Sequence, residues 1–198
     1  SGQIVHPGIV QFASPWHGWE YWLVVTPYPN GDASKENPSI LVSHDGATWS
    51  VPTGLTNPII LPEWSNLADA DLFYDSASDS LWIYHIHANT SGQTQAVREV
   101  SSDGINWSAA QVAFTVPDYD LISPSIAKIG STYYIWYIKS GLAGCGSGMN
   151  TIYYRTSADG FAWSDESAAN YTQPGYAPWH IDIIPVPSKG EYWAVLSA

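Results

Sequence analysis

The stretch SHDGATWS at residues 43–50 decides the fold, because it returns as SSDGINWS at 101–108 and as SADGFAWS at 157–164. The three copies share Ser-x-Asp-Gly-x-x-Trp-Ser, and their aspartates are 58 and 56 residues apart, which indicates a repeated supersecondary unit. In each copy we expect the glycine to supply the positive φ of a turn and the aspartate to accept backbone N–H groups across it. The tryptophan can bury its ring between neighbouring sheets. We therefore interpret the repeat as structural rather than catalytic.

The segments between the repeats follow one order in every unit. A short apolar segment comes first, at 6–12, 69–74, 123–129 and 180–186. An aromatic strand follows, at 21–25, 81–85, 133–137 and 192–196, and a third strand runs into the repeat, at 39–43, 96–101 and 152–157. β-branched and aromatic residues dominate these runs, and no convincing amphipathic helix is seen. Four short antiparallel strands in units of about 57 residues predict an all-β fold, the β-propeller.

The number of units predicts an incomplete propeller. The blade units fall at roughly 1–62, 63–116, 117–174 and 175–198, so that one propeller domain holds three blades and part of a fourth. A closed propeller needs about four or more blades to protect its sheet edges, and a partial ring would leave edges exposed. We expect five blades when the ring is complete, in a longer chain or an oligomeric assembly.

Composition restricts the partners. The chain has 18 acidic and 6 basic residues, a net charge of −12, and only 12% charged residues. This balance argues against nucleic acid, which requires basic residues, and against an anionic membrane surface. Apolar runs are only strand-sized and no targeting pattern is present, so we expect no membrane insertion and an extracellular or virion-associated protein. The aromatic, charge-poor surface fits an oligosaccharide or a cell-surface polysaccharide.

The blade pattern resembles glycoside hydrolase family 43 and its five-bladed relatives. The repeated Ser-x-Asp-Gly-x-x-Trp is also similar to the Asp-box of sialidase-like propellers. The run YWLVVTPYP at 21–29, ENPSILVSHDGATWSVPTGLTNPI at 36–59 and WHIDII at 179–184 resemble propeller modules of bacteriophage structural proteins, of the tail or fibre type. The first resemblance implies a carbohydrate-active propeller, and the last implies a virion component.

The family-43 resemblance implies three acidic residues on the inner strands. The base position, just before a proline, is His6 in HPGI, and the second position matches Asp71 in DADL. The general acid falls near Ile122, where no glutamate is present. Inverting hydrolysis needs an acid and a carboxylate about 6.5–9.5 Å apart. Because two positions depart from the pattern, we expect a non-catalytic module; the alternative is a glycoside hydrolase using Asp71 and His6 as a modified acid/base pair.

The inner segments also predict a polar pocket. Their alignment places His6, Asp69, Ser123 and His180 at one position, and Gly8, Asp71, Ser125 and Asp182 two residues later. Residues two apart on a strand share a face. Such side chains could bind a ligand or a divalent cation such as calcium in the central channel, or could line a water-filled channel. No cofactor and no individual metal ligand is assigned.

Loop aromatics are the remaining candidates for substrate binding. Trp64 and Trp179 rank first, because each lies shortly before an inner strand, and Trp16 and Trp19 follow in the loop SPWHGWEYW. Aromatic faces pack against the C–H faces of sugar rings. The alternative is that these rings only cover blade edges.

Three functions follow. The main expectation is a non-catalytic binding or adhesion module, such as a phage tail or fibre protein that contacts bacterial surface glycans. The glycoside hydrolase is the alternative, and a purely structural virion component is the third.

Overall fold

The computed structural model describes residues 3–60, 67–88, 93–141, 150–171 and 173–197. No α-helix is present in these ranges, and two short 3-10 helices, η1 (Pro29–Gly31) and η2 (Ala33–Lys35), lie between strands. The strands are β1 (Ile4–Trp16), β2 (Trp19–Pro27), β3 (Ser39–Ser43), β4 (Leu67–Asp75), β5 (Ser80–Ala88), β6 (Thr94–Ser101), β7 (Gln111–Val116), β8 (Asp120–Ile129), β9 (Thr132–Ser140), β10 (Thr151–Ser157), β11 (Ser167–Ala168), β12 (His180–Val186) and β13 (Glu191–Ser197).

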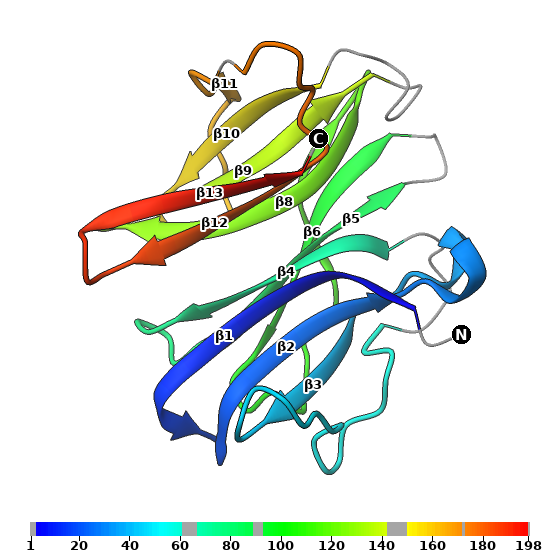
Figure 1. The fold of residues 1–198 in the computed structure, drawn as a ribbon, viewed down its shortest axis with the longest axis vertical. Helices are drawn as coiled ribbons and strands as arrows, with labels where there is room; N and C mark the ends of the chain where they lie inside the picture. The colour runs from blue at the N-terminus through cyan, green and yellow to red at the C-terminus, as the bar shows by residue number, and fades with distance from the viewer. Residues whose placement is uncertain (1–2, 61–66, 89–92, 142–149, 172, 198) are drawn as a thin grey trace. The chain divides into compact units, whose positions relative to one another are not determined.

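The strands form four sheets in chain order, as Figure 1 shows. Their strand orders are β1-β2-β3, β4-β5-β6-β7, β8-β9-β10-β11 and β12-β13. Pairs such as β2–β3 and β9–β10 are antiparallel, so each sheet is a meander of strands that are neighbours in sequence. This arrangement confirms the predicted all-β propeller class with four-stranded blades.

The chain divides into two compact units. Unit 1 comprises Ser1–His87 and Val97–Gln111, and unit 2 comprises Ala88–Ala96 and Val112–Ala198. No helix among the described residues is long and apolar enough to cross a membrane.

The repeated motif forms the same turn three times. In the second copy, one carboxylate oxygen of Asp103 accepts the N–H groups of Ile105 at 2.8 Å and Asn106 at 2.7 Å. The intervening Gly104 has a φ of 75°, the left-handed region that glycine tolerates. The aspartates at 45 and 159 make equivalent bonds to the residues two and three positions later. The local interactions agree with the structural interpretation of the repeat.

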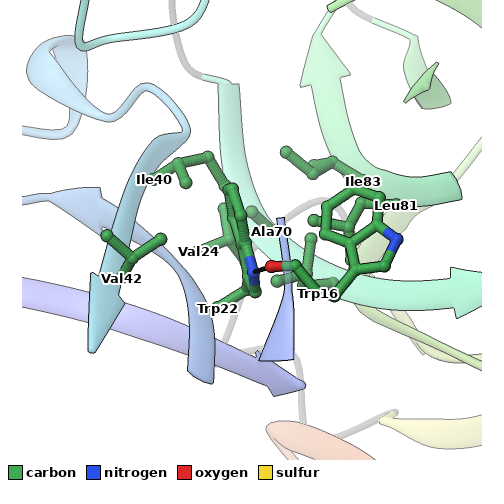
Figure 2. Packing of buried hydrophobic residues seen from close by; sticks show 9 residues of the cluster. Trp16, Trp22, Val24, Ile40, Val42, Ala70, Leu81 and Ile83 are labelled. Carbon is green, nitrogen blue, oxygen red and sulfur yellow. Dashed lines mark hydrogen bonds between the residues drawn. The ribbon is translucent and has the colours of Figure 1, made fainter. Parts of the chain in front are cut away.

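The core of unit 1 lies between its first two sheets, and Figure 2 shows most of it. Trp22 is almost completely buried, and its indole N–H donates to the carbonyl of Trp16 at 3.2 Å. Gly104 lies against the Trp22 ring so closely that an added Cβ would be 2.1 Å from a ring carbon. Trp16 itself is buried at the end of β1, and its indole N–H donates to Asp79 at 2.8 Å. The expectation of a loop-exposed Trp16 is therefore wrong, because the β1 strand extends to this residue and its ring fills the core.

The core of unit 2 is built from isoleucines. Ile122, Ile138, Ile152 and Ile181 form the cluster, and Trp179 packs against it while partly exposed. Strands β8 and β12 contribute to this cluster, so that burial of apolar side chains, worth about 1.5–3 kcal/mol each, holds β12 to β8.

Candidate functional site

Three inner strands share one backbone irregularity. His6 in β1, Asp69 in β4 and Ser123 in β8 have φ values of 53°, 54° and 51°. Each lies at a break in strand register, next to the pairings that resume at Gly8, Asp71 and Ser125. Positive φ is uncommon for residues other than glycine, and a bulge turns a side chain into a new direction. The alignment of these three positions in the sequence therefore corresponds to a shared conformation.

His6 and Asp69 form an ion pair within unit 1. The imidazole Nδ1 contacts a carboxylate oxygen of Asp69, and the two side chains are only 19% and 4% exposed. Burial acts to lower the pKa of His6, but the hydrogen bond and charge of Asp69, together with the charge of Glu36, outweigh it and raise that pKa above its ordinary value. The pair therefore favours a protonated imidazole.

Glu36 is a third ionisable group of this cluster. It ends η2, where its backbone N–H donates to Ala33 and its carbonyl accepts the N–H of Leu67 at 3.2 Å, so its backbone is held at the start of β4. The side chain is buried. Desolvation first, and the negative charge of Asp69 second, raise the pKa of Glu36 to about 7, although His6 acts in the opposite direction. A carboxyl that titrates near neutrality can both accept and donate a proton at physiological pH.

Sequence reasoning missed Glu36. Glu36 lies in the loop ENPS, whereas the family resemblance implies acidic residues on the inner strands. The available signal was an acid directly before Asn-Pro at the entry to β3, where Pro38 favours extended chain. That signal indicates a rigid loop, but it does not show that the loop lies beside β4.

Asp71, a candidate catalytic residue of the alternative hydrolase hypothesis, turns towards its own strand. Its carboxylate accepts the N–H of Leu72 at 2.8 Å. A Cβ added to Gly8 would be 2.6 Å from that same Leu72 nitrogen and 2.9 Å from the Asp71 oxygen, so β1 and β4 approach to a distance that requires glycine. The structure thus pairs His6 with Asp69, and the catalytic role of Asp71 stays a prediction.

In unit 2 serine hydroxyls at the equivalent positions make the hydrogen bonds. The Ser123 hydroxyl donates to the carbonyl of Ile181 at 3.0 Å and accepts its N–H at 3.1 Å. The Ser125 hydroxyl accepts the N–H of Ile183 at 2.9 Å and donates to Asp182 at 3.3 Å. Two serines of β8 thereby fasten the backbone of β12.

The other predicted residues have varied surroundings. Trp19 is half-buried and stacks on His44 with ring centroids 4.2 Å apart. Trp179 contacts the half-buried His180, the first residue of β12, edge to face. Trp64 lies outside the described residues. Substrate binding by these residues and by Asp182 stays a prediction.

Unit 1 contains two side chains whose donor atoms suit a divalent cation. His6 and Asp69 offer an imidazole and a carboxylate, two donor types that divalent cations accept. The divalent cation that the sequence analysis left open, such as calcium, stays a prediction.

Comparison with known proteins supports a propeller fold of the glycoside hydrolase type. No protein family model matches it. It is 30% identical, over an alignment of 234 residues, to an A type blood N-acetyl-α-D-galactosamine deacetylase from Flavonifractor plautii, and the alignment covers 96% of this chain but 30% of that protein. The crystal structure of an N-acetylgalactosamine deacetylase from F. plautii, in complex with blood group B trisaccharide, has a TM-score of 0.88 and 28% identity, with 98% of this chain and 62% of that one covered. The chain therefore spans less than two thirds of either relative.

A thermostable family-43 glycoside hydrolase shares the fold. The TM-score is 0.69 at 14% identity, with 96% of this chain and 64% of the hydrolase covered. This likeness confirms the glycoside-hydrolase-type propeller. The deacetylase structure contains a bound trisaccharide, and an oligosaccharide is the class of partner that the sequence analysis predicts for this chain.

These findings correct the main functional expectation. A non-catalytic phage binding module is contradicted, because the similar sequence and the similar structure are both of a deacetylase, an enzyme. The alternative of an enzyme is better supported. The lack of a glutamate near Ile122 argued only against glycoside hydrolysis by the family-43 mechanism. The same fold can support other enzymatic reactions.

Proposed function

We propose that this chain carries the proton-transfer groups of a hydrolase that removes the acetyl group from an N-acetylated amino sugar of a glycan. The observation that carries the proposal is Glu36, buried beside the His6–Asp69 ion pair with a pKa near 7. The likeness to a deacetylase supports the choice of bond.

Glu36 is the proposed general base and acid. In its ionised form it takes a proton from a water molecule whose oxygen attacks the amide carbonyl carbon. The C–N bond then breaks, and the same carboxyl returns the proton to the departing nitrogen. One water is consumed, and the products are acetate and a free amino sugar. A pKa close to the working pH suits both transfers.

The ion pair is proposed to stabilise the oxyanion of the tetrahedral intermediate. Asp69 contacts Nδ1 of His6, so a proton offered to the substrate would come from Nε2. The raised pKa of His6 favours the protonated ring, and a pre-positioned donor of this kind stabilises developing negative charge.

The test uses blood group A trisaccharide, with blood group B trisaccharide, which has no acetamido group, as the matched substrate. We expect acetate from the A substrate only, with its sugar chain intact by mass spectrometry. Glu36→Gln should lower the rate about 10²–10⁴-fold. Glu20→Gln, a partly exposed acid of unit 1 paired with His44, should not. An unaltered rate in Glu36→Gln, or the absence of acetate release from N-acetylated glycans, would contradict the proposal.

Glycoside hydrolysis is the second candidate. Two carboxyl groups, those of Glu36 and Asp69, interact electrostatically in one buried cluster, and hydrolases of this fold class use a carboxyl pair. Shorter oligosaccharides without acetate in the same assay would support this reaction.

A further inference from the structure

Unit 2 contains a groove beside a short outer strand. β11 has two residues, Ser167 and Ala168, which pair with Tyr154 and Tyr153 of the seven-residue β10. The N-terminal part of β10 continues beyond this pairing. There a groove of about 360 Å³ is lined by residues that include Asn150, Tyr153, Tyr171, Gln173, Pro174 and Tyr176.

A rigid turn forms one wall of the groove. In the sequence Gln173-Pro174-Gly175-Tyr176, the N–H of Tyr176 donates to the carbonyl of Gln173 at 3.2 Å, and Gly175 has a φ of 84°. Proline second and glycine third, with positive φ at the glycine, are the signature of a type II turn. The turn holds Gln173 and Tyr176 in place before a ligand arrives, which lowers the entropic cost of binding.

The chemistry of the lining selects an uncharged ligand. All of the lining residues that the structure describes are uncharged, in a chain whose net charge is −12. Tyr176 is 63% exposed and Tyr171 is 37% exposed. Aromatic faces with neighbouring amides are the combination that binds sugar rings, through C–H contacts and through hydroxyl hydrogen bonds. The volume is at the small end of the range for ligand sites, about 300–1,000 Å³, and suits a short stretch of glycan.

A cation beside this lining, Lys139, is already paired. Lys139 lies over the Tyr153 ring, 4.8 Å from its centroid, but its ammonium group binds Glu166 at 2.6 Å. The lysine thereby stiffens the tyrosine without offering an open positive charge. An anionic ligand consequently has less to gain here than a neutral one.

We propose that the groove beside β10 and β11 is an auxiliary carbohydrate-binding site for neutral oligosaccharides. It uses a different set of residues from the cluster of His6, Asp69 and Glu36, and its binding requires no turnover. On a polymeric or cell-surface glycan, a second binding site raises the effective concentration of the substrate.

The experiment measures binding by calorimetry in the Glu36→Gln background, so that no substrate is consumed. The probes are blood group A trisaccharide, blood group B trisaccharide, cellotetraose and arabinobiose, and a sulfated oligosaccharide is the charged control. We expect Tyr171→Ala with Tyr176→Ala to weaken the binding of at least one neutral probe tenfold or more. Tyr192→Ala, a similarly exposed tyrosine of β13, is the matched control and should leave the affinity unchanged.

Further variants separate binding from folding. Tyr176→Trp should retain the affinity because it keeps an aromatic face, whereas Gln173→Ala should lower it. Unchanged affinity in the double tyrosine variant, tighter binding of the sulfated probe, or no binding by the panel would overturn the proposal. The outcome is independent of acetate release: loss of binding in the tyrosine variants supports the groove even if deacetylation is absent.

Discussion

The inner strands of the two units differ in chemistry at equivalent positions. In unit 1, β1 and β4 approach through the His6–Asp69 ion pair, with Gly8 close to Asp71. In unit 2, β8 and β12 approach through serine hydroxyls bonded to the backbone of Ile181 and Ile183. His6, Asp69 and Ser123 nevertheless share a left-handed backbone.

The difference shows that one backbone arrangement can serve two purposes. A serine satisfies neighbouring backbone groups and carries no charge, so its contribution is structural. A buried ion pair is costly to desolvate and is weak evidence for stability. In unit 1 the ion pair lies beside Glu36, whose pKa is raised to about 7. Burial also raises the pKa of Asp182 in unit 2, but its partner is the Ser125 hydroxyl, so we propose that the chemistry belongs to unit 1.

In the comparison of the two units, the largest expected effect comes from breaking the ion pair. His6→Ala or Asp69→Asn should lower kcat/KM for deacetylation about 10²–10³-fold, because oxyanion stabilisation is lost. Ser123→Ala should leave kcat/KM unchanged and lower stability by about 1 kcal/mol. Steady-state kinetics and thermal denaturation of the three variants check this. Equal loss of activity in Ser123→Ala would remove the distinction between the units.

The next effect concerns the close approach at Gly8. Gly8→Ala should destabilise the protein by about 1–3 kcal/mol, because its Cβ would overlap the Leu72 nitrogen, 2.6 Å away, and the strands must separate. Gly130→Ala is the control, because a Cβ added at Gly130 has no neighbour within 4 Å. Its φ of 62° adds backbone strain to the control variant, but no steric overlap. Denaturant unfolding measures both, and a smaller loss at Gly8 would contradict the close approach.

The smallest effect is a pH dependence of stability. The pKa of Glu36 is about 7 in the native protein against 4.5 for the ordinary group, so between these values the native state holds more protons than the unfolded state. Stability due to this group is therefore full below about 4.5 and falls as the pH rises towards 7. At pH values above 7, Glu36→Gln should stabilise the protein by on the order of 1 kcal/mol, because it removes a buried negative charge that solvent screens only in part.

The same titration sharpens the functional assignment. Deacetylation should increase with pH through about 7, as Glu36 loses its proton, while stability falls over the same interval. Rates and unfolding free energies measured across this range test the two slopes together. A wild-type stability that does not fall, or a Glu36→Gln variant with the same slope, would show that Glu36 is not the titrating group.

Local interactions could be predicted from the sequence. The turn at Asp103 depends on bonds to residues two and three positions later, so its spacing alone was sufficient. The alignment of the repeated segments placed His6 and Asp69 at equivalent positions, but simple alternation along a strand does not predict the left-handed backbone and register break that both residues share. Trp16 could not be assigned in this way, because its burial depends on where β1 ends and on the distant Asp79.

The sequence by itself determined the propeller class, the repeated turns and the carbohydrate-suited composition, because these depend on local spacing and on totals. Tertiary structure decided the chemistry. Glu36 is an ordinary loop acid until its backbone meets Leu67 and its side chain is buried near Asp69, which raises its pKa to about 7. Desolvation and charge act through space between residues that are far apart in the chain, and that proximity exists only in the folded protein.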